Sequence, residues 1–319
     1  MRRFWTLGPW ETFLLVVLVL VYAANAWISP EFLTLDNQVN LFQLSIEKII
    51  IALVMAFVIV NAEIDLSVGS MMGLSACAFA AMVGEAGVPA ALACLLCLGI
   101  GLLGGFLNGF FVARVGLPSL VVTLSTLIGF RGVARVLLED RSIGSFPDWF
   151  EGLGQRGLIG PLTLGLLSFV LLFALLYTVL ERAGFGRKTY VIGVSREVAD
   201  YAGIDTGRHK ILIFMASGLV AAYAGLLFAA RVGAVRGDVG QGFELDIITM
   251  VLLGGVSIFG GSGTLTGVGL AILIVLALRN GMALMNVTGH IQTGVVGLLL
   301  IASVLVPRLG QRLSGRTVT

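Results

Sequence analysis

The chain has 319 residues, of which 58% are hydrophobic and only 12% are charged. This charged fraction is about half that of an average soluble domain. The 20 Lys and Arg residues nearly balance the 18 Asp and Glu residues, giving a net charge of +2, so no strongly basic surface for nucleic acid is predicted. These values exclude soluble enzymes and DNA-binding proteins and indicate an integral membrane protein.

The three cysteines, Cys77, Cys94 and Cys97, all lie within apolar stretches, where thiols usually serve as small packing groups. Cys94 and Cys97 have the spacing of a redox pair, but packing is the favoured interpretation in an apolar helix. The two histidines, His209 and His290, are far apart, and no nucleophile is paired with a base. We therefore predict no disulfide, no metal site, no catalytic residues and no enzyme activity of the chain itself.

Long apolar runs follow one another along the whole chain. A membrane-spanning helix needs about 20 apolar residues, or about 30 with its connection, so the chain has room for about ten crossings. Some runs are short or interrupted by glycine, and we expect these to form broken or re-entrant helices. The runs are 10–28, 46–60, 66–83, 89–112, 120–138, 162–180, 211–230, 247–259, 265–284 and 291–306.

The basic residues predict how the chain is oriented in the membrane. Arg2 and Arg3 precede the first run as in a signal peptide, but no convincing cleavage site follows, so we expect an uncleaved first helix. Basic residues crowd the connection 182–210 and follow the last run, which predicts that this connection and both termini are cytoplasmic. Ten crossings place both termini on one side, in agreement. The acidic loops 29–45, 139–161 and 232–246 then face the exterior or periplasm.

The chain reads as one membrane domain, 1–319. No polar segment exceeds about 30 residues, whereas a soluble domain usually needs about 50 or more. The phosphate-binding pattern G-x-x-x-x-G-K-[ST] is also missing, because Gly184-Phe-Gly-Arg-Lys-Thr189 lacks the glycine before the lysine. We therefore expect no nucleotide cofactor on this chain, and any ATP hydrolysis must come from a partner.

Glycine is frequent, with 43 residues, and Gly101, Gly105 and Gly109 form a ladder with a four-residue period. In lipid such ladders let helix backbones approach closely. We interpret this one as a helix-packing face, of the kind that a compact bundle with a gated pathway also uses.

Several polar residues are expected near membrane depth. Glu63 and Asp65 lie between two apolar runs, where a buried carboxylate costs about 2.5–3.5 kcal/mol. Two interpretations are open: Asp65 and Ser67 line a cavity, or Asp65 is only the N-cap of the next helix. The residues alone favour the cap. Asn108 and Thr123 are more often packing residues than ligand contacts. Arg131 and Arg279 are expected to reach an interface.

The basic connection contains a segment, 193–205, that reads as a short helix. Ser195 is a good N-cap, Glu197 lies in the first turn and Gly203 suits a C-terminal stop. Its apolar stripe includes Val198 and Tyr201 with Ala202. A helix this short does not hold alone in water. It must dock on its own bundle, on lipid headgroups or on a partner, and the residues alone do not choose.

The chain resembles the membrane permease subunits of bacterial ATP-binding-cassette importers for sugars, the ribose, arabinose, xylose and rhamnose group that includes autoinducer-2 permeases. The resemblance covers nearly the whole chain, and the order and spacing of its motifs make it specific. The motifs are Ile64-Asp-Leu-Ser-Val-Gly69, Gly104-Gly-Phe-Leu-Asn-Gly109, Gly116-Leu-Pro-Ser-Leu-Val-Val-Thr-Leu124, Arg131-Gly-Val-Ala134, Gly184-Phe-Gly-Arg187, Ala202-Gly-Ile204, Gly242-Phe-Glu-Leu-Asp-Ile247, Leu253-Gly-Gly-Val-Ser-Ile-Phe-Gly-Gly261 and Asn280-Gly281.

The resemblance implies an all-α polytopic protein of the bacterial inner membrane that carries a pentose, deoxyhexose or similar sugar. It implies that 193–205 is the coupling helix for an ATPase subunit, which alone binds ATP and Mg²⁺. It also implies a second permease subunit and a periplasmic sugar-binding protein. The implied coupling residues are Ser195, Glu197, Val198, Ala199, Tyr201, Ala202 and Gly203; the pathway candidates on family motifs are Asp65, Ser67, Asn108, Thr123, Glu244 and Asp246.

The chain departs from the family pattern in two places. Asn61-Ala62-Glu63 stands where the family usually has two glycines, which adds a charge and removes backbone freedom. The coupling segment has Gly193-Val-Ser-Arg-Glu-Val-Ala199 in place of a Gly-Gly-Asn and an Ala-Ala pair, which favours a dedicated ATPase partner. The alternative function is a self-sufficient ion-coupled transporter or channel that uses Glu63 and Asp65.

Overall fold

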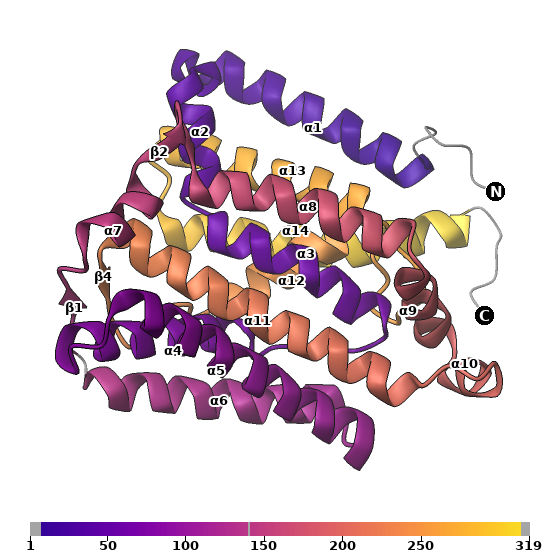
Figure 1. Ribbon diagram of the computed structural model, residues 1–319. Coiled ribbons are helices and arrows are strands. Elements are labelled where there is room, and N and C mark those ends of the chain that lie inside the picture. The colour runs from indigo at the N-terminus through magenta and orange to yellow at the C-terminus, as the bar shows by residue number, and fades with distance from the viewer. Residues whose placement is uncertain (1–7, 140, 314–319) are drawn as a thin grey trace.

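The computed structural model describes residues 8–139 and 141–313, which form an elongated bundle of helices joined by short loops (Figure 1). The predicted all-α class is confirmed for this part of the chain, where the few strands are only two or three residues long. The helices are α1 (Pro9–Ile28), α2 (Leu35–Gln43), α3 (Ile46–Val60), α4 (Val68–Ala80), α5 (Ala90–Phe110), α6 (Ser119–Leu138), α7 (Asp148–Gln155), α8 (Leu164–Glu181), α9 (Gly184–Val194), α10 (Arg196–Tyr201), α11 (Thr206–Val232), α12 (Phe243–Leu253), α13 (Leu265–Leu284) and α14 (Gly289–Leu313).

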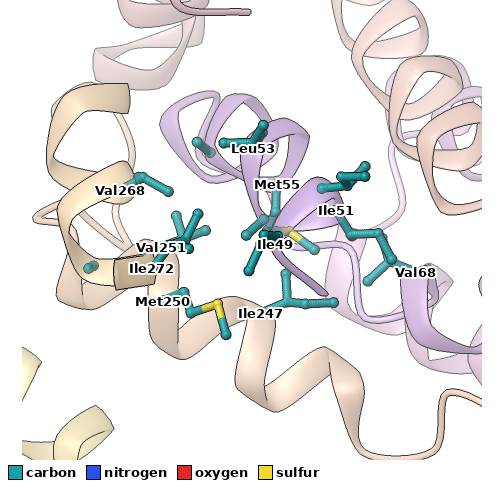
Figure 2. Packing of buried hydrophobic residues seen from close by; sticks show 14 of the residues in the cluster. Ile49, Ile51, Leu53, Met55, Val68, Ile247, Met250, Val251, Val268 and Ile272 are labelled. Atoms are coloured by element: carbon teal, nitrogen blue, oxygen red, sulfur yellow. The ribbon is translucent and has the colours of Figure 1, made fainter. Parts of the chain in front are cut away.

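Helix α3 forms the centre of the bundle. Every residue of this helix except Lys48 is buried, as expected for a helix that is apolar on all sides. Figure 2 shows Ile49 and Met55 of α3 beside side chains of α12 and α13, such as Val251 and Ile272. Because lipid tails are as apolar as these side chains, close packing rather than escape from water holds such helices together.

The glycine ladder of α5 packs against α11, so the predicted packing face is confirmed. A Cβ atom on Gly105 would meet the backbone carbonyl oxygen of Phe214, and one on Gly218 would meet that of Gly101. Gly109 likewise faces the backbone of Ile211. The two helix backbones can approach this closely only because glycine stands at these positions.

The described residues include seven helices that are long and apolar enough to cross a bilayer, and an eighth crossing arises if α2 and α3, bent by 59°, count as one span. The seven spans are Pro9–Ile28, Val68–Glu85, Ala90–Val115, Ser119–Leu138, Leu164–Glu181, Thr206–Val232 and Leu265–Leu284. A multi-pass membrane protein is thus supported, whereas ten crossings remain a prediction. α12 has 11 residues, about 16 Å at 1.5 Å per residue, and is too short to cross alone.

Two predicted runs differ in extent from the helices that the structure contains. The run 66–83 was expected to begin a helix at once, but residues 61–67 are non-helical and α4 begins only at Val68. Ala62 starts this break with φ +60°. The run 247–259 ends its helix at Leu253, and a glycine-rich loop leads from there to α13. Gly255, two residues after Leu253, has φ +86° and stops the helix there.

The two ends of the bundle differ in what they carry (Figure 1). One end holds α9, α10, the start of α1 and the end of α14. The other end holds α7 and the short strands, in which β1 (Ile143–Gly144) pairs antiparallel with β4 (Ala234–Val235), and β2 (Gly157–Ile159) with β3 (Leu162–Thr163). Phe79 stacks on Phe150 of α7, with ring centroids 4.2 Å apart, and anchors this second end to α4.

Candidate functional site

A cluster of polar side chains lies inside the bundle where the chain breaks between α3 and α4. The Asp65 carboxylate is 1% exposed and accepts three hydrogen bonds from uncharged donors. The Ser67 backbone N–H (3.0 Å) and hydroxyl (2.6 Å) donate to its Oδ1, and the Ser217 hydroxyl of α11 donates to Oδ2 (2.8 Å). Asn108 of α5 donates from Nδ2 to the Ser67 hydroxyl oxygen at 2.9 Å. Two helices, α5 and α11, and the break therefore meet around one carboxylate, and we call Asp65, Ser67, Asn108 and Ser217 the polar cluster.

Asp65 does not act as the cap of α4. The N-cap residue of α4 is Ser67, whose side chain accepts no capping hydrogen bond, and the Asp65 carboxylate is turned inward to Ser217 instead. Of the two interpretations left open by the residues, the structure thus favours a role inside the bundle.

The polar cluster contains an unused acceptor. Asn108 is 1% exposed, and its Oδ1 atom has no hydrogen-bond partner. An unsatisfied polar atom of this kind costs about 1–3 kcal/mol, so buried amides are normally fully bonded. Asn108 Oδ1 is therefore a hydrogen-bond acceptor of the polar cluster that has no donor within the structure.

Thr123 of α6 supports the break rather than the polar cluster itself. Its hydroxyl lies 3.2 Å from the carbonyl oxygen of Ile64 and 2.9 Å from that of Ser119. The Ile64 N–H donates to the Ser119 hydroxyl oxygen at 3.2 Å. α6 therefore fixes the non-helical segment that carries Asp65.

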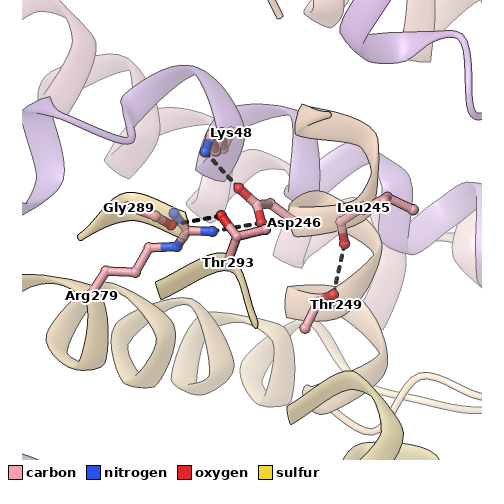
Figure 3. Close-up of polar contacts among 7 residues, drawn as sticks. All are labelled: Lys48, Leu245, Asp246, Thr249, Arg279, Gly289 and Thr293. Carbon is pink, nitrogen blue, oxygen red and sulfur yellow. Dashed lines mark hydrogen bonds and ion pairs between the residues drawn. The ribbon is translucent and has the colours of Figure 1, made fainter. Parts of the chain in front are cut away.

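The two acidic residues at the start of α12 lie in ion pairs, of which Figure 3 shows those of Asp246. Asp246 bridges Lys48 of α3 and Arg279 of α13, with 2.6 Å in each case between a carboxylate oxygen and the cation. Glu244 lies 3.9 Å from Arg131 and packs beside Gly69 in the first turn of α4. Arg131 and Arg279, expected to reach an interface, are instead largely buried against carboxylates of their own chain.

The candidate pathway residues thus fall into three sets. Asp65, Ser67 and Asn108 touch one another, whereas Thr123 holds the backbone next to them. Glu244 and Asp246 lie in separate ion pairs, Glu244 close to the turn that follows the polar cluster. Sequence reasoning missed Ser217, a hydroxyl within the apolar run 211–230, because such residues usually bond to their own helix.

The expected short helix of the connection is present as α10. The Ser195 hydroxyl oxygen accepts from the Val198 N–H at 3.2 Å, and Gly203 ends the helix with φ +76°. Gly193, however, still belongs to the preceding helix α9.

One face of α10 has nothing packed on it. Val198 and Tyr201 are 61% and 94% exposed, Val194 at the end of α9 is 74% exposed, and Ala199 on the opposite side of α10 is fully buried. We call Val194, Val198 and Tyr201 the apolar patch. Arg196, Glu197 and Asp200 surround it with charge.

Within the residues that the structure describes, no group of three or more His, Cys, Asp or Glu side chains is arranged to hold a metal ion. All three cysteines are free thiols. His209, which lacked any evident role in the sequence, is buried and lies 2.9 Å from the Thr189 hydroxyl, so it joins α11 to α9.

Bundled spanning helices and a helix break that carries buried polar groups are features of membrane transport components. Comparison with known proteins agrees. Residues 37–304 match the family described as branched-chain amino acid transport system/permease component.

The chain is also similar to named relatives. It is 33% identical over 304 residues to the ribose import permease protein RbsC of Bacillus subtilis, covering 95% of this chain and 92% of the relative. It is 34% identical over 304 residues to the autoinducer 2 import system permease protein LsrD of Escherichia coli, covering 93% and 91%. No solved structure matches the chain. The chain therefore belongs to this permease family, and its resemblance to permease subunits of sugar ATP-binding-cassette importers is confirmed.

Proposed function

We propose that this chain is the subunit of an ATP-binding-cassette importer that carries a sugar across the membrane by alternating access. The apolar patch on α10 carries this proposal. A six-residue helix that leaves Val198 and Tyr201 in water is unfavourable unless a partner covers it. A separate ATPase subunit is the partner that such a permease needs, because the chain has no phosphate-binding motif.

The coupling residues are then Ser195, Glu197, Val198, Ala199, Tyr201, Ala202 and Gly203. Ser195 and Gly203 set the two ends of the helix, Ala199 packs it on the bundle, and Val198 and Tyr201 face the ATPase. When ATP closes the partner subunits, the force reaches the bundle through this helix.

The polar cluster supports a pathway for a polyhydroxylated solute. Asn108 Oδ1 is free to accept, and the hydroxyls of Ser67 and Ser217 both donate and accept. A pentose or deoxyhexose offers hydroxyl groups that match such sites. We assign Asp65, Ser67 and Asn108 to solute contact, Thr123 to support of the break, and Glu244 and Asp246 to the outer part of the pathway.

We infer the remaining partners from the elements that lie at each end of the bundle. α10, the start of α1 and the end of α14 would face the cytoplasm, and α7 with the short strands would face a periplasmic sugar-binding protein (Figure 1). α5 and α6 expose apolar side chains, such as Leu95 and Val136, for lipid or for a second permease subunit. We place the protein in the inner membrane, with ATP and Mg²⁺ bound only by the ATPase.

Substitution of the apolar patch tests the proposal. Val198→Asp introduces a charge into the ATPase contact, which costs at least about 1.4 kcal/mol and so weakens binding at least tenfold. We expect the variant to insert normally, to lose the ATPase on purification and to lose uptake of radiolabelled ribose, xylose and arabinose. Trp149→Ala, an exposed aromatic residue on α7, is the control that should keep the ATPase bound. An unchanged ATPase complex and uptake in Val198→Asp would refute the coupling role.

An ion-coupled transporter that uses Glu63 and Asp65 is the alternative function. Glu63 already pairs with Lys210, and Asp65 accepts hydrogen bonds from three donors, so neither carboxylate is without a partner. Uptake that collapses with a protonophore at constant ATP would favour the alternative, and uptake that persists favours the importer.

A further inference from the structure

A buried ion pair joins the helix break to the beginning of α11. The ammonium group of Lys210 contacts Oε1 of Glu63, and each residue is 8% exposed. Glu63 lies two positions before Asp65 in the non-helical segment, and Lys210 lies near the start of α11. The pair therefore connects two segments that are 147 residues apart in the sequence.

On the α11 side, Lys210 belongs to a tightly bonded unit that includes the coupling segment. The Thr206 hydroxyl donates to Asp200 of α10 at 2.7 Å, and the Asp205 carboxylate caps α11 by accepting from the Arg208 N–H at 2.9 Å. His209 bonds to Thr189 of α9. A displacement of α10 must therefore carry the first turns of α11, and Lys210 with them.

On the other side, Glu63 belongs to a short, braced segment. Its backbone N–H donates to the Val58 carbonyl oxygen at 3.1 Å, at the end of α3. The next residue, Ile64, is held by Ser119 and Thr123 of α6. Only Ile64 separates Glu63 from Asp65, so a shift of the Glu63 side chain reaches the polar cluster through two peptide units.

Burial keeps the two charges together. An ionised group in a membrane interior is strongly disfavoured without its partner, so separation costs more than movement of the backbone that carries it.

We propose that Glu63 and Lys210 are positioning residues that transmit movement of the coupling segment to the polar cluster. This proposal rests on the proposed function, because it needs an ATPase to move α10. The movement passes from α10 to α11 through Thr206 and Asp205, across the ion pair to Glu63, and along the break to Asp65 and Ser67.

The test reads the position of the polar cluster without requiring the solute to be known. In the complete transporter, Ser67→Cys reports access of a small maleimide, and peptide mass spectrometry separates this position from Cys77, Cys94 and Cys97. The labelling rate is compared between nucleotide-free protein and protein trapped with Mg²⁺, ATP and vanadate. Coupling between distant sites usually amounts to changes of about 5–150-fold, so we expect at least about a fivefold change in rate.

Glu63→Gln and Lys210→Met, each in the Ser67→Cys chain, should reduce this change to less than about twofold while ATP hydrolysis and assembly persist. The exchanged pair, Glu63→Lys with Lys210→Glu, should restore the change in labelling rate on trapping. A role in stability alone does not predict this restoration. Glu47→Gln is the matched control, because Glu47 at the start of α3 forms a buried ion pair with Arg231 near the end of α11, far from the helix break.

Two results would overturn the proposal. One is a Glu63→Gln variant in which trapping changes the labelling rate as much as it does when Glu63 is present. The other is a labelling rate that trapping does not change when Glu63 and Lys210 are both present. If a single variant fails to fold, the exchanged pair is the deciding variant. A folded complex of the exchanged pair in which trapping does not change the labelling rate also contradicts the proposal. Failure of the proposed function is distinct, because it appears as an unchanged ATPase complex and unchanged uptake in Val198→Asp.

Discussion

The amide of Asn108 on α5 donates to the hydroxyl oxygen of Ser67 at 2.9 Å, while its own oxygen has no partner. This contact ties the glycine-rich helix α5 to the break before α4. It leaves one acceptor inside a membrane bundle where every other member of the polar cluster is hydrogen bonded to a neighbour.

Ser217→Ala tests how strongly the polar cluster is held. The substitution removes the hydroxyl that donates to Asp65 Oδ2 and leaves a buried carboxylate oxygen unpaired. We expect a loss of about 1–3 kcal/mol, seen as a lower melting temperature of the purified protein in detergent. Ser125→Ala is the control, because that exposed hydroxyl bonds only to its own helix at Val121, and its melting temperature should stay the same. Equal melting temperatures for the two variants would show that Ser217 does not hold Asp65.

Gly105→Ala tests the contact between α5 and α11. The added methyl group would overlap the carbonyl oxygen of Phe214, so the helices must separate, at a cost of about 1–3 kcal/mol. Gly99→Ala on the same helix meets nothing within 4 Å and should be neutral or slightly stabilising. Thermal unfolding of both variants measures the difference, and similar curves would argue against this close approach.

Asp246→Asn tests the ion pairs at the start of α12. The change leaves Lys48 and Arg279, both mostly buried, without a carboxylate, which should cost about 3–5 kcal/mol. Glu139→Gln alters an exposed pair with Arg141, worth at most about 1 kcal/mol, and serves as the control. The amounts of folded protein in membranes and the melting temperatures should separate the two variants clearly. A stable Asp246→Asn protein would mean that the two cations find other partners.

Much of this architecture could be predicted from the sequence, because it depends on local patterns. The run 46–60 coincides with α3, the ladder from Gly101 to Gly109 packs as expected, and Ser195 and Gly203 mark the ends of α10. Caps, glycine spacing and apolar runs are set by residues close together in the chain, so one sequence suffices to read them.

The polar contacts could not be predicted in the same way. The hydrogen bond from Ser217 to Asp65 spans 152 positions, and the pair of Lys210 with Glu63 spans 147. Lys210 looked like one more cytoplasmic basic residue, and Arg279 like one that reaches an interface. Lys210 pairs with Glu63, which its place in the basic connection did not indicate, and Arg279 pairs with Asp246, because pairing within the protein lowers the cost of a buried charge.

The number of crossings depends on where helices break. Residues 61–67 are non-helical and α12 ends early at Leu253, but hydropathy alone does not distinguish a helix from non-helical chain that is buried in protein. Ala62, a non-glycine residue at φ +60°, shows that the first break is imposed by tertiary contacts.

The most direct test of the central claim is purification of the tagged chain from its own membrane in a gentle detergent, followed by mass spectrometry of the proteins that accompany it. We predict an ATPase of the ATP-binding-cassette type in fixed proportion to the chain, with a second permease subunit. A chain that is purified alone, under conditions in which comparable membrane complexes stay intact, would contradict the importer and favour a self-sufficient transporter.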